Sequence, residues 1–149
     1  MNNFFQFEAD FVDSLRCIPM QVRYKLDTCG IKLKLSHWIQ FSATERQALV
    51  EKPCNDEQVT VYRDFIEQLV QQHTGVAATE LPIEPHPAWL NSTEVPQDLV
   101  AKAEEVGTTI TLQQWQLLTP LQRFALIKLS RPGHENKNFV PALQEFCLL

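Results

Sequence analysis

The chain has no closely spaced cysteines and few glycines, and these absences exclude several classes of protein. Its cysteines are Cys17, Cys29, Cys54 and Cys147, and no two of them form the C-x-x-C pair that is usual in zinc and iron–sulfur sites. The sequence contains no P-loop, no G-x-G-x-x-G and no G-x-S-x-G. We therefore expect no catalytic residues, no metal and no cofactor, and we expect that the protein is not an enzyme.

Long apolar runs and an early positive charge are also missing. No run approaches the roughly 18 apolar residues of a membrane-spanning helix. The first basic residue is Arg16, whereas a secretory signal peptide begins with positive charge. We expect a cytoplasmic protein without a membrane partner, in which the cysteines are reduced thiols.

Positive charge is scarce overall and is concentrated in one stretch. The net charge is −5, but residues 16–34 hold five basic residues and one acid, so the rest of the chain carries about −9. Nucleic-acid binding requires a basic face, so an acidic balance argues against it and weakens a helix-turn-helix interpretation. A basic stretch on an acidic protein suits an acidic protein partner or a small anion better.

The chain resembles itself at an offset of 77 residues. Gly30, Trp38 and Arg46 fall on residues of the same type. Two capping boxes, in which a hydroxyl and a Glu or Gln three residues later satisfy the first amides of a helix, also coincide. The coinciding residues in the second half are Gly107, Trp115 and Arg123, and the capping boxes are Ser42–Glu45 and Thr119–Gln122. This pattern predicts two diverged copies of one helical unit.

The fold class that we predict is all-α: a single compact domain, residues 1–149, built from two helical repeats. The repeats span about 18–70 and 95–147, and a proline-rich linker of about 76–94 joins them. We expect the linker to be neither helical nor part of a sheet. Helices are predicted by capping, apolar spacing and terminating glycines over residues 19–30, 43–52, 56–73, 96–107, 120–129 and 139–146. Ahead of the first repeat, the phenylalanine spacing fits either a helix or a strand.

Residues 31–35 alternate between apolar and basic, which predicts a short extended link. We expect no partner strand for it, with Ile31, Leu33 and Leu35 facing inward and Lys32 and Lys34 facing outward. In the predicted core, Trp38 and Trp115 serve as large anchors. Cys29 and Cys147 fall on valines in the other repeat, so we expect both to be small buried residues.

Several residues are candidates for binding. A protein partner could contact the aromatic and acidic amino terminus, the basic stretch, or a polar loop near the carboxyl end, although a solvated terminus and an ordinary turn explain the first and last equally well. The candidate contact residues are Phe7, Asp10, Phe11, Arg16, Lys32, Lys34, His134, Glu135 and Asn136. Arg46 and Arg123 either tie each capped helix to carbonyl groups of its own unit or bind an anion.

Most of the chain resembles the nitrate reductase associated protein family. The resemblance is carried by residues 7–20 (FEADFVDSLRCIPM), 25–30 (KLDTCG), 118–129 (LTPLQRFALIKL) and the segment 131–146. It implies a cytosolic accessory protein needed for active assimilatory nitrate reductase, an enzyme that carries molybdenum cofactor and an iron–sulfur cluster. The family has no catalytic motif that can be carried over to this sequence.

The leading hypothesis is therefore a non-catalytic protein that binds nitrate reductase during its maturation or its work. The alternative is a protein that binds a small anion such as nitrate, or a molybdopterin-type ligand, near Arg46 and Arg123.

Overall fold

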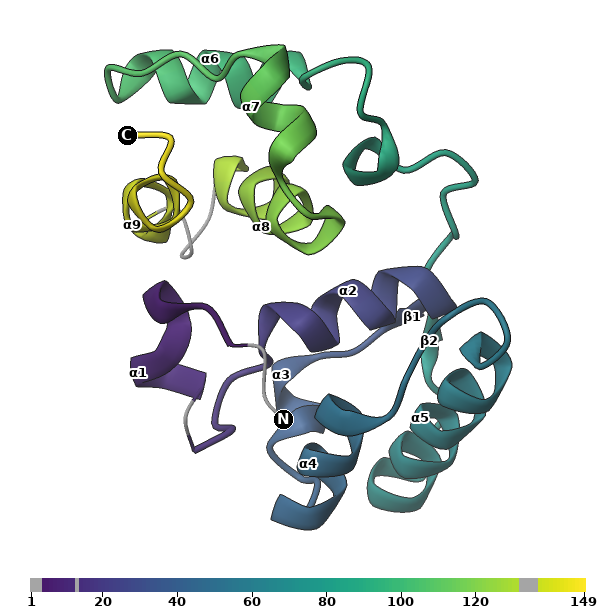
Figure 1. The fold of residues 1–149 in the computed structure, drawn as a ribbon. Coiled ribbons are helices and arrows are strands. Elements are labelled where there is room, and N and C mark those ends of the chain that lie inside the picture. The colour runs from purple at the N-terminus through teal and green to yellow at the C-terminus, as the bar shows by residue number, and fades with distance from the viewer. Residues whose placement is uncertain (1–3, 13, 132–136) are drawn as a thin grey trace. The chain divides into compact units, whose positions relative to one another are not determined.

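A computed structural model of the chain describes residues 4–12, 14–131 and 137–149. The chain divides into two compact units, Met1–Ile83 (unit 1) and Glu84–Leu149 (unit 2). Helices dominate both units, as the sequence predicts (Figure 1).

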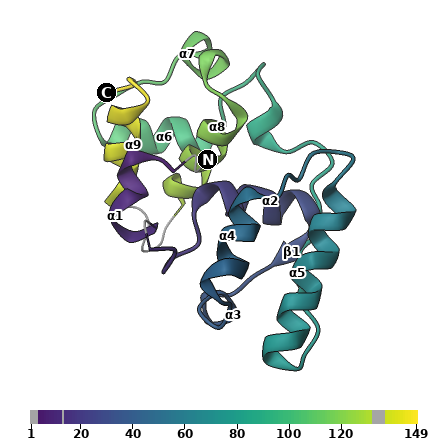
Figure 2. The ribbon, with the colours of Figure 1, turned by 60° about the horizontal axis from the view of Figure 1, so that its bottom comes forward.

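Unit 1 contains most of the longer helices. Its elements are η1 (Gln6–Glu8), α1 (Ala9–Val12), α2 (Met20–Cys29), β1 (Ile31–Lys32), α3 (Leu35–Trp38), α4 (Ala43–Glu51), α5 (Val59–Thr74) and β2 (Thr79–Glu80). The amino-terminal segment, for which helix and strand were both open, contains helical turns. Helix α2 packs against α4 and α5 (Figure 2). The core between these helices includes Val22, Leu26, Trp38, Leu49 and Ile66.

The limits of α2 follow from local chemistry. Pro19 precedes the helix, and the buried carboxylate of Glu8 accepts from the backbone N–H of Met20 at 3.3 Å. A negative charge at this position satisfies an unpaired amide and opposes the positive end of the helix dipole. Gly30 ends the helix with φ of 78°, a left-handed conformation that glycine adopts without a steric penalty.

The extended link after α2 has a partner strand, so the expectation that it has none was wrong. Strands β1 and β2 are antiparallel, with Ile31 opposite Glu80 and Lys32 opposite Thr79. Residues 79–80 lie in the predicted linker, which therefore takes part in a small sheet. The partner was missed because a two-residue polar strand 47 positions away leaves no periodic signal in the sequence.

Unit 2 consists of η2 (Ala88–Leu90), α6 (Gln97–Glu105), α7 (Leu112–Leu117), α8 (Pro120–Ser130) and α9 (Phe139–Glu145). Gly107 follows α6 with φ of 88°. The predicted capping box at Thr119 and Gln122 forms, as does the one at Ser42 and Glu45 in unit 1. Helix α8 packs against η2, α6 and α9.

Two further expectations need correction. Cys29 is buried as predicted, but Cys147 is exposed and has a positive φ of 62°. It lies just past the end of α9, where the chain has already left the helix that would have turned the side chain inward. The linker also contains a helical turn, η2, because Trp89 packs edge-on against Phe124 with ring centroids 5.0 Å apart.

Candidate functional site

Arg46 of α4 binds the carboxyl end of α3. Its Nε donates to Trp38 O at 3.1 Å, its Nη2 to Ile39 O at 2.8 Å and its Nη1 to Leu15 O at 3.3 Å. The last carbonyls of a helix have no partner within it, and a cation there also opposes the negative end of the dipole. Trp38 completes the arrangement, because its Nε1 donates to the same Leu15 carbonyl at 2.7 Å. We call Trp38, Arg46 and the Leu15 carbonyl the unit 1 clasp.

Arg123 of α8 makes the corresponding contacts in unit 2. Its Nε donates to Trp115 O at 3.0 Å and its Nη2 to Gln116 O at 3.1 Å, both one offset of 77 residues from the unit 1 acceptors. Its Nη1 donates to Trp89 O at 3.3 Å, and Trp115 Nε1 donates to Asn91 O at 2.8 Å. Trp115, Arg123 and the carbonyls of Trp89 and Asn91 form the unit 2 clasp.

Both clasps have a structural role. Each one ties the corner between two consecutive helices to a segment that precedes the first helix of its unit. Three donors of each guanidinium are used in this way, and these contacts fit the first interpretation of Arg46 and Arg123. The contacts with carbonyls do not test anion binding, which stays a prediction that titration with nitrate, followed by tryptophan fluorescence, would check.

Two cations of the basic stretch are used inside unit 1. Lys25 Nζ donates to Val50 O at 2.6 Å and to Lys52 O at 2.7 Å, at the carboxyl end of α4. Burial lowers the pKa of this lysine. Arg23 Nε donates to Ile18 O at 3.1 Å. These two residues therefore hold the unit together and have less freedom to meet a partner.

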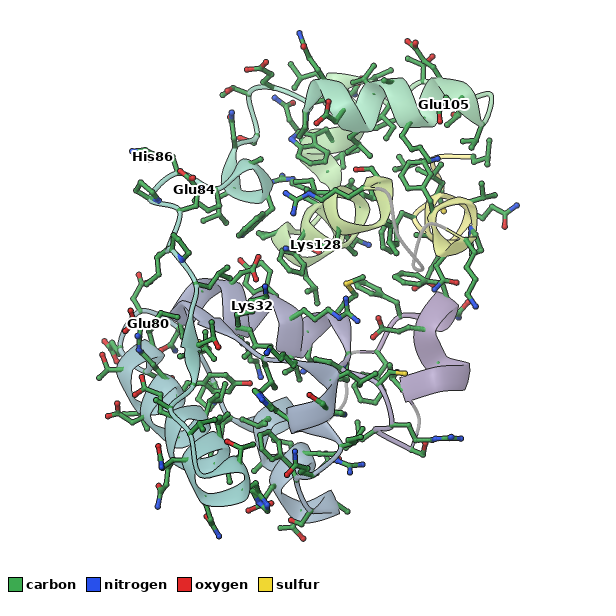
Figure 3. All side chains as sticks on the ribbon, turned by 180° about the vertical axis from the view of Figure 1, so that it is seen from behind. Lys32, Glu80, Glu84, His86, Glu105 and Lys128 are labelled. Carbon is green, nitrogen blue, oxygen red and sulfur yellow. The ribbon has the colours of Figure 1, made fainter. Side chains whose placement is uncertain are left out.

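The other three cations of the stretch are exposed. Arg16, Lys32 and Lys34 form no side-chain hydrogen bond or ion pair within the part of the chain that the structure describes. Figure 3 labels Lys32 and, on the paired strand, Glu80, whose carboxylate is bonded to Arg63 Nη2 at 3.0 Å. The outward orientation predicted for Lys32 and Lys34 is present.

Helix α3 places apolar side chains beside these cations. Leu35 and Ile39, four residues apart, are 51% and 56% exposed, whereas Trp38 between them is fully buried. The inward orientation expected for Leu35 was wrong, because the extended link ends at Lys34 and a helix then rotates Leu35 away from the core. The sequence analysis missed Ile39, although its spacing from Leu35 and Trp38 indicated a helix with one buried and one open side.

The contacts of Trp38 bring the two ends of the basic stretch toward α3. Arg16 directly follows Leu15, whose carbonyl is bonded by Trp38, and Lys34 is the N-cap of α3. Arg16 and Lys34 are therefore closer in the fold than the intervening helix α2, about 15 Å long, would allow in a straight chain. We call Arg16, Lys32, Lys34, Leu35 and Ile39 the α3 surface.

The remaining candidates lie near the amino terminus and in the polar loop. Phe7 stacks on Phe5 with ring centroids 5.2 Å apart and is half-buried. The side chains of Asp10 and Phe11 lie outside the described residues, and so does the predicted site at His134, Glu135 and Asn136. Of these candidates, the structure thus describes Phe7, which it packs on a neighbouring ring.

Searches of the structure for two other kinds of site add little. Among the described residues, no group of three His, Cys, Asp or Glu side chains could hold a metal ion. None of the described helices combines the length and the apolar character needed to cross a membrane.

Comparison with known proteins bears on the whole chain. The model of the conserved nitrate reductase-associated protein family matches residues 4–146. The chain belongs to this family. No curated protein and no solved structure matches the chain. The match includes both clasps and the α3 surface.

Proposed function

We propose that this member of the nitrate reductase-associated family is a non-catalytic, cytoplasmic accessory protein that binds assimilatory nitrate reductase and supports its activity or maturation. Membership of a family described by its association with that enzyme supports a role beside the reductase. The observation that carries the binding mode is the α3 surface, where cations without internal partners flank exposed Leu35 and Ile39.

This composition suits a protein partner. Binding sites on proteins commonly combine an apolar centre, which supplies affinity, with a charged rim, which sets encounter rate and register. Cations without internal partners contribute little to folding stability, so they are available for a negatively charged partner. The acceptor that we propose is therefore an acidic, partly apolar surface of nitrate reductase.

The electrostatic half of the proposal is tested by reversing charge. Purified full-length K32E/K34E should bind nitrate reductase about five- to tenfold more weakly than wild type at low ionic strength, and the difference should shrink as salt screens the charges. The matched control is K102E/K137E, which changes the net charge by the same amount on unit 2. Titration calorimetry over a range of salt provides the measurement, and circular dichroism checks that helical content is unchanged.

The apolar half is tested separately. L35S/I39S should weaken binding at all salt concentrations, because it removes apolar contact area. Its control is V61S/V76S, since Val61 and Val76 are 62% and 57% exposed in the same unit. If both test variants bind as wild type does, the contact lies elsewhere. If wild-type protein itself shows no binding to nitrate reductase, the accessory role by direct association is wrong.

A further inference from the structure

Cys29 and Cys54 are 25 residues apart in the sequence and meet in unit 1. Cys29 is the last residue of α2 and is fully buried, while Cys54 lies half-buried in the segment between α4 and α5. Their thiol groups are hydrogen-bonded to one another. Cys29 Sγ lies 3.6 Å from Leu26 O, and Cys54 Sγ lies 3.7 Å from Lys25 O, so neighbouring carbonyls of α2 hold the two sulfurs.

The surroundings make the two sulfurs chemically different. The hydrogen bond from Cys29 lowers the pKa of Cys54, the Lys25 ammonium lowers it further, and burial opposes them. The same hydrogen bond and burial raise the pKa of Cys29. Lys25 is fixed by the carbonyls of Val50 and Lys52, so its charge stays beside the pair. Cys54 is thus the thiol that ionises first and that solvent reaches, and Cys29 is the protonated neighbour behind it.

We propose that Cys54 and Cys29 form a reversible oxidation site, in which Cys54 reacts with a hydroperoxide and Cys29 closes a disulfide with it. This inference is independent of the proposed binding to nitrate reductase. It differs from a general sensitivity to oxidation, because exposure alone favours the exposed Cys147 over the half-buried Cys54.

The chemistry balances with hydrogen peroxide as the oxidant. The Cys54 thiolate attacks one peroxide oxygen, the O–O bond breaks, and hydroxide leaves and takes a proton to become water. Cys54 is then a sulfenic acid, oxidised by two electrons while the peroxide is reduced. The sulfur of Cys29 attacks that of Cys54, the S–S bond forms, the S–O bond breaks, and the departing hydroxide takes the proton of Cys29 as a second water. Two equivalents of a small thiol restore both cysteines by exchange.

The bond would join α2 to the segment between α4 and α5. Cys29 is already fixed on its backbone side, because Arg63 Nη1 donates to its carbonyl at 3.0 Å. A cross-link that closes this stretch of chain restricts the unfolded state, so the oxidised protein should be more stable. We expect a rise in Tm of about 5 °C.

The experiment uses the reduced full-length protein and graded hydrogen peroxide. After free thiols are blocked with N-ethylmaleimide, tryptic peptides are analysed without reduction. The four cysteines fall in the separate tryptic peptides 17–23, 26–32, 47–63 and 138–149. The proposal requires a linked pair of 26–32 with 47–63 at the lowest effective dose, reversed by dithiothreitol and unchanged in C17S/C147S. The Tm of the same samples should rise with the linked fraction.

Two variants assign the roles. C54S should form no intramolecular disulfide, and C29A should accumulate a Cys54 sulfenic acid that dimedone traps. Because a change at buried Cys29 could disturb folding, the wild-type peptide map decides the matter alone. Loss of the free thiol in 17–23 or 138–149 before that in 47–63, or oxidation without the linked pair, would overturn the proposal.

Discussion

The two clasps solve the same problem with different degrees of burial. In each unit an arginine bonds the last carbonyls of a short helix, and the tryptophan of that helix bonds a carbonyl near the start of the unit. Arg123 is only 7% exposed and lies over the Trp115 ring, 5.6 Å from its centroid, whereas Arg46 is partly open to solvent. The contacts that recur at one offset are those that a duplication requires, and common descent of the two units stays a prediction.

The surroundings of the clasps have diverged further. In unit 1 the capping Glu45 also bonds His73 of α5 at 2.8 Å, while Gln122 holds the equivalent position in unit 2. Helix α5 has 16 residues and α9 has 7. The difference shows that the hydrogen bonds of the corner are compatible with quite different packing around it. Unit 1 has a titratable contact and the exposed cations of the α3 surface, and unit 2 has the more deeply buried arginine.

The largest expected effect breaks the clasps themselves. R123M should lower the free energy of unfolding by about 3 kcal/mol, because it leaves buried carbonyls without a donor. R46M should cost less, about 1–2 kcal/mol, since water can replace part of its contacts. Urea unfolding followed by tryptophan fluorescence measures both.

The control for the clasp variants is R16M, which removes an exposed arginine and should stay within about 0.5 kcal/mol of wild type. Equal losses in R46M and R123M would mean that burial does not distinguish the clasps.

The glycines after α2 and α6 give a smaller contrast. Both have positive φ, so alanine costs about 1 kcal/mol at each. A Cβ at Gly30 would also lie 2.8 Å from Ile83 Cγ1 and 3.0 Å from Leu81 O, whereas a Cβ at Gly107 would meet nothing within 4 Å. We expect a loss of about 2 kcal/mol in G30A and about 1 kcal/mol in G107A, measured by thermal and urea unfolding.

A double variant sharpens this contrast. I83A should recover part of the loss in G30A, because it removes one of the two clashes, and should recover nothing in G107A. If G30A and G107A cost the same, segment 81–83 does not pack against Gly30 as the structure describes.

The smallest expected effect concerns pH. The backbone N–H of Ser42, and then His73, hold the pKa of Glu45 below its usual range. A carboxyl with a lowered folded pKa contributes stability above its unfolded pKa, near 4.3, and loses it as pH falls through the folded value. E45Q keeps a capping acceptor, as Gln122 does, but has no charge.

Wild type should therefore exceed E45Q in stability at neutral pH by about 0.5 kcal/mol or less, and the difference should vanish at acidic pH. Urea midpoints from neutral to acidic pH test this. A difference that persists at the lowest pH would show that the carboxylate acts through packing and not through charge.

Local signals in the sequence were enough for much of the fold. Capping boxes, terminating glycines and apolar spacing predicted α2, α4, α5, α6, α8 and α9 close to their observed limits, because each signal acts within one helical turn. The pairing of Trp38 with Trp115 and of Arg46 with Arg123 also came from sequence spacing. It singled out the residues whose contacts now define both clasps.

Long-range contacts were not predictable in this way. Strand β2, the turn at Ala88–Leu90 and the exposed Cys147 depend on which distant segment supplies a partner, and no periodic pattern records that choice. The same holds for the candidate site. The sequence indicated that Lys32 and Lys34 face outward, but only the fold showed that Leu35 and Ile39 are exposed beside them and that Cys29 and Cys54 share a hydrogen bond.

The sequence by itself therefore determined the helical class, most helix limits and the family, because these depend on residues that are neighbours along the chain. The tertiary structure decided which cations are used internally, which apolar residues remain open and which thiols meet. Those outcomes depend on packing between elements dozens of residues apart, where burial and unpaired carbonyls select one partner among many.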